Sequence, residues 1–303
     1  MTLPLIISPE VKAALENQAP VVALESTLIT HGLPYPTNVE TALAMEAAVC
    51  DASAIPATIA ILKGAITVGI SAADIESLAR MPADQVRKCS RRDLAIATAL
   101  GEYGATTVAG TMIVAQMAGI KLFATGGIGG VHRGQPHDVS ADLTELGRTP
   151  VTVVSSGAKS ILDLPLTLEA LETNGVPILG YRTDVLPAFY SGRTDLPIDQ
   201  RIESAAEAAA IIRASQALGA QNGMLIAVPA PAEHELELER AEAAIAQATR
   251  EAETSGVVGN EITPYVLSRV SELTDGASMA ANIALLINNA RIAGAIAREL
   301  SRL

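Results

Sequence analysis

The sequence is poor in cysteine, in aromatic residues and in basic residues. Its two cysteines, Cys50 and Cys89, have no close-spaced partners, which excludes a disulfide framework and a zinc cluster and fits a reducing cytoplasm. Lys and Arg number 21 against 33 Asp and Glu, a formal charge of −12, so no nucleic-acid or anionic-membrane surface is expected. Because only 2% of residues are aromatic and Trp is absent, a bound base would be held by amides and hydroxyls rather than stacked on Tyr35, Tyr181 or Tyr265.

Long apolar runs are also missing. The first 18 residues lack the basic segment and apolar stretch of a secretory signal. The Ala- and Ile-rich stretch 276–300 is interrupted by Asn282, Asn288, Asn289 and Arg291, whereas a membrane span needs about 20 apolar residues. We therefore predict a buried helix of a soluble protein there. With 49% apolar residues, the chain of 303 residues can build a large core that needs no disulfide bond or metal site to stabilise it.

Short apolar runs alternate with helical periodicity along the chain. Runs bounded by Gly, Pro or polar residues predict buried strands at 21–24, 58–62, 65–69, 121–124, 151–154, 177–180 and 224–228. Apolar residues at helical spacing predict helices at 37–52, 72–79, 93–102, 111–118, 159–174, 203–218, 233–254, 264–273 and 278–300. This alternation is typical of an α/β protein with a largely parallel sheet covered on both faces. We expect one domain over residues 1–303, although 185–235 could contain an inserted subdomain.

Ligands bind to such sheets where strands end, and Lys159 lies beyond one of these ends. The segment 151–163 ends an aliphatic run in a Ser-Ser-Gly turn, after which Lys159 starts the expected helix. A cation beside apolar residues at the positive end of a helix dipole is disfavoured. Its amine would then lose a proton readily and act as a nucleophile in Schiff-base chemistry. The alternative is a solvated lysine at a helix end.

Glu25 directly follows the apolar run Val21–Leu24. Burial at the end of that strand would raise the pKa of the carboxyl group and suit it to general acid–base catalysis. The alternative is a carboxylate paired with an arginine or bonded to loop amides.

The stretch 124–134 begins with four closely spaced glycines, at 126, 127, 129 and 130, directly after a strand. Without Cβ atoms, their amides can approach a phosphate or a sugar closely, and Thr125 and Arg133 add donors. No Gly-Lys-Ser/Thr follows, so the stretch is not a P-loop, and its spacing fits a dinucleotide fingerprint poorly. A glycine-rich turn without a ligand is the alternative.

Asp138 and Asp142 lie four residues apart with Ser140 between them. Their oxygens could share a hydrated Mg²⁺ or Mn²⁺ ion. On these residues alone we prefer the alternative, in which Asp138 or Ser140 caps a following helical turn.

Three smaller features complete the candidates. The basic run Arg87–Arg92 could attract a small anion such as a sugar phosphate, or could be a solvated surface patch. Asn282 lies on an apolar helix, where a buried amide needs a partner, either a ligand or neighbouring backbone. His31, which precedes Gly32 and Pro34, is interpreted as structural.

Several segments in one order carry a resemblance to a known family. They are residues 21–27 with 31–32, 90–94, 125–134, 140–143, 157–164, 180–181 and 263–265. Together they resemble, over almost the whole chain, the pseudouridine-5′-phosphate glycosidase family, whose members are also called indigoidine synthase A-like proteins.

The resemblance implies a three-layer α/β/α fold, a homotrimer, and reversible cleavage of pseudouridine 5′-phosphate into uracil and ribose 5-phosphate. It implies that Lys159 forms an imine with the ring-opened ribose and that Glu25 donates protons. It also implies that Asp138 binds Mn²⁺, one per subunit, or another divalent cation. The implied substrate contacts are Lys88, Val108, Thr125, His132, Ser140, Ala141, Asp142 and Asn282.

The residue types suit this chemistry. A C–C glycosidic bond has no heteroatom leaving group, so the usual route with two carboxyl groups is not available, whereas a lysine imine supplies an electron sink. Two other functions stay open. The same lysine could act on another sugar phosphate, as in an aldolase or a C–C condensation. Alternatively, 124–142 could form a non-catalytic nucleotide-binding module with Lys159 structural.

Overall fold

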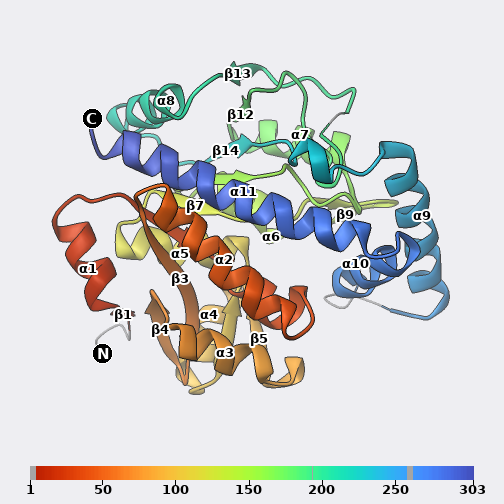
Figure 1. The fold of residues 1–303 in the computed structure, drawn as a ribbon, viewed down its shortest axis with the longest axis horizontal. Coiled ribbons are helices and arrows are strands. Elements are labelled where there is room, and N and C mark those ends of the chain that lie inside the picture. Colours follow the sequence, from red (N-terminus) through yellow and green to blue (C-terminus); the bar gives the residue numbers. More distant parts are fainter. Residues whose placement is uncertain (1–4, 193, 258–261) are drawn as a thin grey trace.

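The protein is built around a large, mostly parallel sheet (Figure 1). The structure, a computed structural model, describes residues 5–192, 194–257 and 262–303. The strands of this sheet are β1 Leu5–Ile7, β2 Val21–Leu24, β3 Ile55–Leu62, β4 Ala65–Val68, β5 Val86–Cys89, β6 Tyr103–Thr106, β7 Leu122–Ala124, β10 Thr152–Ser155, β12 Ile178–Tyr181, β13 Gln200–Ile202 and β14 Met224–Ala227. The main path runs β1-β4-β3-β2-β7-β10-β14-β12-β13, while β6 pairs with β3 and β5 pairs with β6.

The strands from β3 to β13 along this path run parallel to one another, and the antiparallel pairs are those of β3 with β4 and with β6. In β2, β7, β10 and β14 every residue is buried. Strands that are covered on both faces read as continuous apolar runs, which is why the sequence predicts these four within one residue at each end.

Helices cover both faces of the sheet. They are α1 Pro9–Glu16, α2 Thr37–Asp51, α3 Ala72–Arg80, α4 Arg91–Ala99, α5 Val108–Ala118, α6 Ala141–Leu146, α7 Leu164–Thr173, α8 Ala205–Ala217, α9 Leu238–Thr254, α10 Ile262–Leu273 and α11 Ala277–Leu300, with short turns η1 Leu28–Gly32, η2 Ala83–Gln85 and η3 Ala232–His234. Figure 1 shows α11 and α2 crossing in front of the sheet, and α5 and α6 behind it. This arrangement confirms the predicted three-layer α/β/α fold.

The C-terminal helix α11 is central to the packing. Among the described residues it is the one helix long and apolar enough, by length and composition, to cross a membrane. It packs along α2 and α8 and against β2, β7 and β10, and its buried stripe includes Ala281, Leu285 and Ala293. The prediction of a buried helix at 278–300 is therefore confirmed.

A second, three-stranded antiparallel sheet corrects one prediction. It consists of β8 Val131–His132, β9 Gln135–Val139 and β11 Leu162–Asp163, in the order β11-β8-β9. Helix α7 begins only at Leu164, because Asp163 caps it by accepting a 3.0 Å hydrogen bond from the Leu166 amide, and Pro165 occupies its first turn. Lys159 therefore lies in a loop, so the predicted helix start at residue 159 and the helix-dipole argument built on it are wrong.

Candidate functional site

Two polar residues meet at the carboxyl ends of adjacent parallel strands. Leu24 of β2 pairs with Ala124 of β7, so Glu25 and Thr125 emerge side by side. Glu25 is buried at 8% exposure, and its carboxyl group accepts a hydrogen bond from the Thr125 hydroxyl. A buried Glu25 at this edge is what its position in the sequence predicts.

A cavity of about 540 Å³ opens at this edge. Most of the predicted site residues line it, namely Glu25, Lys88, Val108, His132, Asp138, Ser140, Ala141, Asp142 and Lys159. Thr125 is connected to the cavity through its bond to Glu25, whereas Asn282 lies in a neighbouring cavity. The structure thus brings together residues that are spread over more than 130 positions of the sequence.

Other polar residues that line this cavity escaped the sequence prediction. They are Thr27, Asp93, Thr107, Thr144, Arg148 and Thr263. Thr107 caps α5 by accepting a hydrogen bond from the Gly110 amide, a role that its place before an apolar helix indicates. Thr263 belongs to the family-like segment 263–265, whereas Arg148 lies in none of these segments, and only the tertiary fold brings both residues to this cavity.

Burial sets the protonation behaviour of the site. It raises the pKa of the Glu25 carboxyl group, and the opposing effects of the Lys159 charge and the Thr125 hydrogen bond are smaller. Burial also lowers the pKa of Lys88, and the positive charge of Lys159 lowers it further. The site therefore contains a glutamate whose pKa is raised and a lysine, Lys88, whose pKa is lowered.

Asp142 fixes the glycine-rich loop. Its two carboxylate oxygens accept hydrogen bonds from the amides of Ala109, at 2.9 Å, and Gly129, at 2.8 Å. A Cβ atom on Gly129 would lie 2.2 Å from the Ser140 hydroxyl oxygen, so only glycine fits there. Ser140 caps α6 by accepting a hydrogen bond from the Asp142 amide, which confirms the capping interpretation for Ser140.

The loop that carries Lys159 runs beside the glycine-rich loop. Ala158 forms a parallel bridge with Ile128, and the Lys159 amide donates to the Ile128 carbonyl at 3.1 Å. Lys159 is half-buried and lines the same cavity as Glu25. Contacts between two loops, and not a helix terminus, determine its position.

Asp138 is the residue whose surroundings bear on a metal ion. It lies on β9 with 49% of its side chain exposed, and one of its oxygens lies 4.0 Å from Nδ1 of His132. Within the described ranges, no three His, Cys, Asp or Glu side chains gather as a set of metal ligands. A single cavity-facing carboxylate suits a divalent cation that keeps most of its water ligands.

Two residues predicted as anion donors are bonded elsewhere. Arg133 donates to Glu242 at 2.6 and 2.8 Å, and Arg87 pairs with Glu102 at 2.5 Å. Of the basic run, Lys88, Arg91 and Arg92 do line the cavity. The run therefore brings basic side chains to the cavity wall, and its attraction of an anion stays a prediction.

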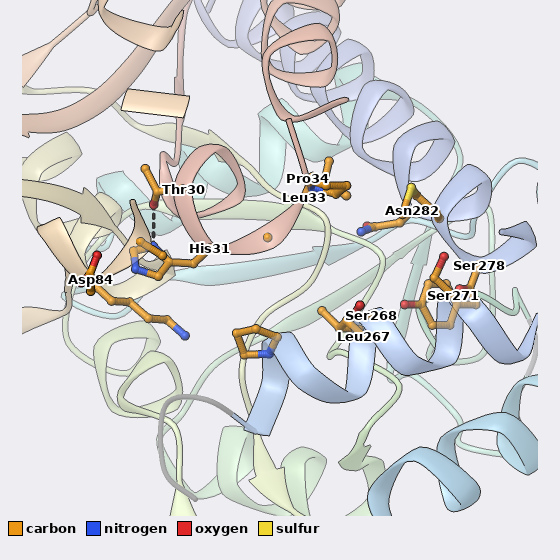
Figure 2. Close-up of a pocket in the computed structure, with 16 residues that line it drawn as sticks. Thr30, His31, Leu33, Pro34, Asp84, Leu267, Ser268, Ser271, Ser278 and Asn282 are labelled. Carbon is orange, nitrogen blue, oxygen red and sulfur yellow. Dashed lines mark hydrogen bonds between the residues drawn. The ribbon is translucent and has the colours of Figure 1, made fainter. Parts of the chain in front are cut away.

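A second cavity, of about 720 Å³, adjoins the first, and Lys88 lines both. Figure 2 shows Ser268 and Ser271 of α10 and Asn282 of α11 on one side of it, with His31 of η1 on the other. Burial lowers the pKa of His31, and the charge of Lys88 lowers it further. His31, interpreted from sequence as structural, thus belongs to a cavity wall.

This second cavity contains few charged groups. Its lining includes the hydroxyls of Thr30, Ser268, Ser271 and Ser278 and the amide of Asn282. Tyr190 also lines it, whereas Tyr35, Tyr181 and Tyr265 line neither cavity.

Comparisons with known proteins agree with this architecture. The family model described as indigoidine synthase A like protein matches residues 10–299. Proteins named pseudouridine-5′-phosphate glycosidase from Geobacillus kaustophilus and Escherichia coli are 54% and 52% identical to this chain, each over 98% of it and over 99% and 96% of their own lengths.

Two solved structures share the fold. The prealnumycin C-glycosynthase AlnA, in complex with ribulose 5-phosphate, is 42% identical, with a TM-score of 0.90 over 98% of this chain and 97% of its own. An indigoidine synthase A-like protein from Thermotoga maritima is 34% identical, with a TM-score of 0.90 over 100% of this chain and 99% of its own. The chain belongs to the indigoidine synthase A-like family of enzymes, which includes the pseudouridine-5′-phosphate glycosidases.

Proposed function

We propose that this protein cleaves pseudouridine 5′-phosphate reversibly into uracil and ribose 5-phosphate, through an imine between Lys159 and the opened sugar. The observation that carries the proposal is one cavity lined by Lys159, Lys88 and a buried Glu25 whose pKa is raised by burial. The names of the relatives support the substrate. The AlnA complex supports an open-chain sugar, because ribulose 5-phosphate, with its phosphate on O5, cannot close a furanose ring.

In the first step the neutral amine of Lys159 attacks C1′ of the ribose. The N–C1′ bond forms, the C1′–O4′ bond breaks, and O4′ takes the proton of Glu25. The attached nitrogen then returns one proton to Glu25. The sugar is now an open chain that carries both the base and the lysine on C1′.

In the second step the nitrogen lone pair forms the C=N bond. The C1′–C5 bond breaks, its electron pair goes to C5 of the base, and C5 takes the proton of Glu25. Water then adds to the imine, which frees ribose 5-phosphate, the neutral amine and one proton that returns to Glu25. The sum is one water consumed per uracil released, and a carboxyl group that is protonated at the start suits both transfers.

The two cavities suit the two halves of the substrate. Lys88, Arg92 and Arg148 bring positive charge to the first cavity, where we place the sugar phosphate. The hydroxyls and the Asn282 amide of the second suit the neutral donors and acceptors of uracil. Lys88, which lines both cavities, would lie next to the bond that breaks.

The proposal includes one Mn²⁺, or another divalent cation, per subunit. Asp138 would hold it, and the bound ion would supply positive charge beside the anionic substrate. Asp138→Ala should then weaken Mn²⁺ binding measured by calorimetry. We further propose a cytoplasmic homotrimer, which the family resemblance supports and light scattering of the purified protein would test.

The direct test is incubation with pseudouridine 5′-phosphate, followed by chromatography for uracil and ribose 5-phosphate. We expect equal amounts of both from the wild-type protein and neither from Lys159→Ala. Intact substrate after long incubation with Mn²⁺ would contradict the proposal.

One neighbour favours a second candidate, the joining of a sugar phosphate to a carbon acceptor other than uracil. AlnA is named a C-glycosynthase and is 42% identical to this chain. Supplying ribose 5-phosphate with uracil or with a phenolic acceptor separates the two functions. Our proposal predicts product with uracil alone.

A further inference from the structure

Arg133 joins three segments of the chain. It follows β8, and its Nε donates to the Leu162 carbonyl at 3.0 Å while Nη2 donates to the Ser160 carbonyl at 2.7 Å. The same guanidinium group donates to both carboxylate oxygens of Glu242 on α9, at 2.6 and 2.8 Å. One side chain thus connects the glycine-rich loop, the turn directly after Lys159, and a distant helix.

Backbone contacts also hold the turn that bears Lys159, because Ala158 bridges to Ile128 before it and Leu162 pairs with His132 after it. The Lys159 amide donates to the Ile128 carbonyl at 3.1 Å, and the Leu162 amide donates to the Lys159 carbonyl at 3.0 Å. Ser160 is buried at 2% exposure. Loss of the guanidinium group would remove the donors to the carbonyls of Ser160 in the turn and of Leu162 at the start of β11, and buried carbonyls need such partners.

Glu242 has no direct route to the reacting atoms. No residue of α9 lines either cavity in the part of the chain that the structure describes. Glu242 contacts the site through Arg133, whose guanidinium plane it holds by two parallel hydrogen bonds. Glu242 therefore fixes the direction in which the N–H groups of Arg133 point toward the backbone carbonyls after Lys159.

We propose that Arg133 and Glu242 are positioning residues, and that their ion pair holds the Lys159 turn so that the amine faces the sugar carbon. This inference rests on the proposed imine chemistry at Lys159. An error of about 1 Å in the placement of a reacting group lowers rates by about 100-fold. Loss of the pair should therefore slow imine formation much more than it weakens substrate binding.

Glu242→Gln tests the inference with a matched control. The side chains of Glu242 and Arg133 are 40% and 33% exposed. The matched pair is Glu251 and Arg269, whose side chains are 33% and 34% exposed and lie 2.5 Å apart, and Glu251 lies on α9 as Glu242 does. Glu251→Gln removes a comparable ion pair without touching the Lys159 turn. Melting temperatures of both variants show whether each is folded.

Two quantities are measured. One is the single-turnover rate at which borohydride traps the imine formed with ribose 5-phosphate, and the other is the KM of that sugar. We expect Glu242→Gln to lower the trapping rate about tenfold with KM changed less than about threefold, and Glu251→Gln to match wild type. Arg133→Ala should lose more, and added guanidinium ion at millimolar concentration should restore part of its rate.

Equal trapping rates in Glu242→Gln and Glu251→Gln would overturn the inference. So would a loss in Glu242→Gln that appears in KM alone. If the wild-type protein forms no adduct on Lys159, the proposed function itself fails. Normal trapping in both the wild type and Glu242→Gln would instead reject only the positioning role.

Discussion

The two cavities that meet at Lys88 differ in the side chains that line them. The first holds lysines, arginines and carboxyl groups, including Lys159 and the buried Glu25. The second holds mainly hydroxyls, one amide and apolar side chains, with Asp84 and Lys88 as its charged residues. Its four polar residues on α10 and α11 are Ser268, Ser271, Ser278 and Asn282, and none of them carries a charge. The difference supports the proposed division, in which the first, charged cavity binds and transforms the sugar phosphate and the second, here called the neutral cavity, receives the base.

The largest expected effect comes from removing the nucleophile in the charged cavity. Lys159→Ala should lower kcat by about 1,000-fold or more, because no imine can form. Lys88→Ala should keep measurable turnover, because Lys88 contributes charge and no covalent bond. Steady-state kinetics measures both, with circular dichroism as the folding control, and an active Lys159→Ala beside an inactive Lys88→Ala would assign the covalent role to Lys88.

Next in size is the loss of the proton donor. Glu25→Gln should lower kcat by roughly 100- to 10,000-fold, the range for general acid–base catalysis. In the proposed mechanism the protonated carboxyl group is the active form, so kcat/KM for cleavage should fall as pH rises through the raised pKa of Glu25. Lys88→Met removes a charge that lowers this pKa, so the fall should move to higher pH. A profile that does not move would show that another group titrates.

A smaller effect would sharpen the contrast between the cavities. Arg148 lines the charged cavity and also lies 3.3 Å from a Glu145 oxygen. Arg148→Ala should raise the KM of ribose 5-phosphate about tenfold, the size expected for a charge-assisted hydrogen bond. The KM of uracil in the synthetic direction should stay near the wild-type value. Equal rises in the KM values of ribose 5-phosphate and uracil would contradict the proposal that the two cavities bind different halves of the substrate.

The smallest effect concerns the neutral cavity. Asn282→Ala removes one amide and should raise the KM of uracil about fivefold, because a neutral hydrogen bond contributes about 1 kcal/mol. The KM of ribose 5-phosphate should not change. The opposite pattern, with the sugar affected and uracil not, would place the sugar in the neutral cavity.

The residues at strand ends were predictable from the sequence. Glu25 and Thr125 directly follow buried runs, and parallel strands end at one edge, so local position alone brings these two together. The buried strands and the long helices follow from continuous apolar runs and helical spacing in the same way.

Other parts of the site depend on contacts that no local pattern encodes. Lys159 was predicted as a candidate on the basis of a helix that begins five residues later, although the Asp163-Leu-Pro165 signal marks the true start. The second cavity was not predicted, because α10 and η1 reach it from opposite ends of the chain. Arg133 was predicted as an anion donor, and only the fold shows its bonds to Glu242 and to the turn after Lys159.

The most direct test of the central claim is to identify the lysine that captures the sugar. The wild-type protein is incubated with ribose 5-phosphate, reduced with borohydride, digested and sequenced by mass spectrometry. We predict a reduced pentose phosphate on Lys159, and no adduct in Lys159→Ala. An adduct on Lys88, or none at all in a preparation that still releases uracil from pseudouridine 5′-phosphate, would contradict the account.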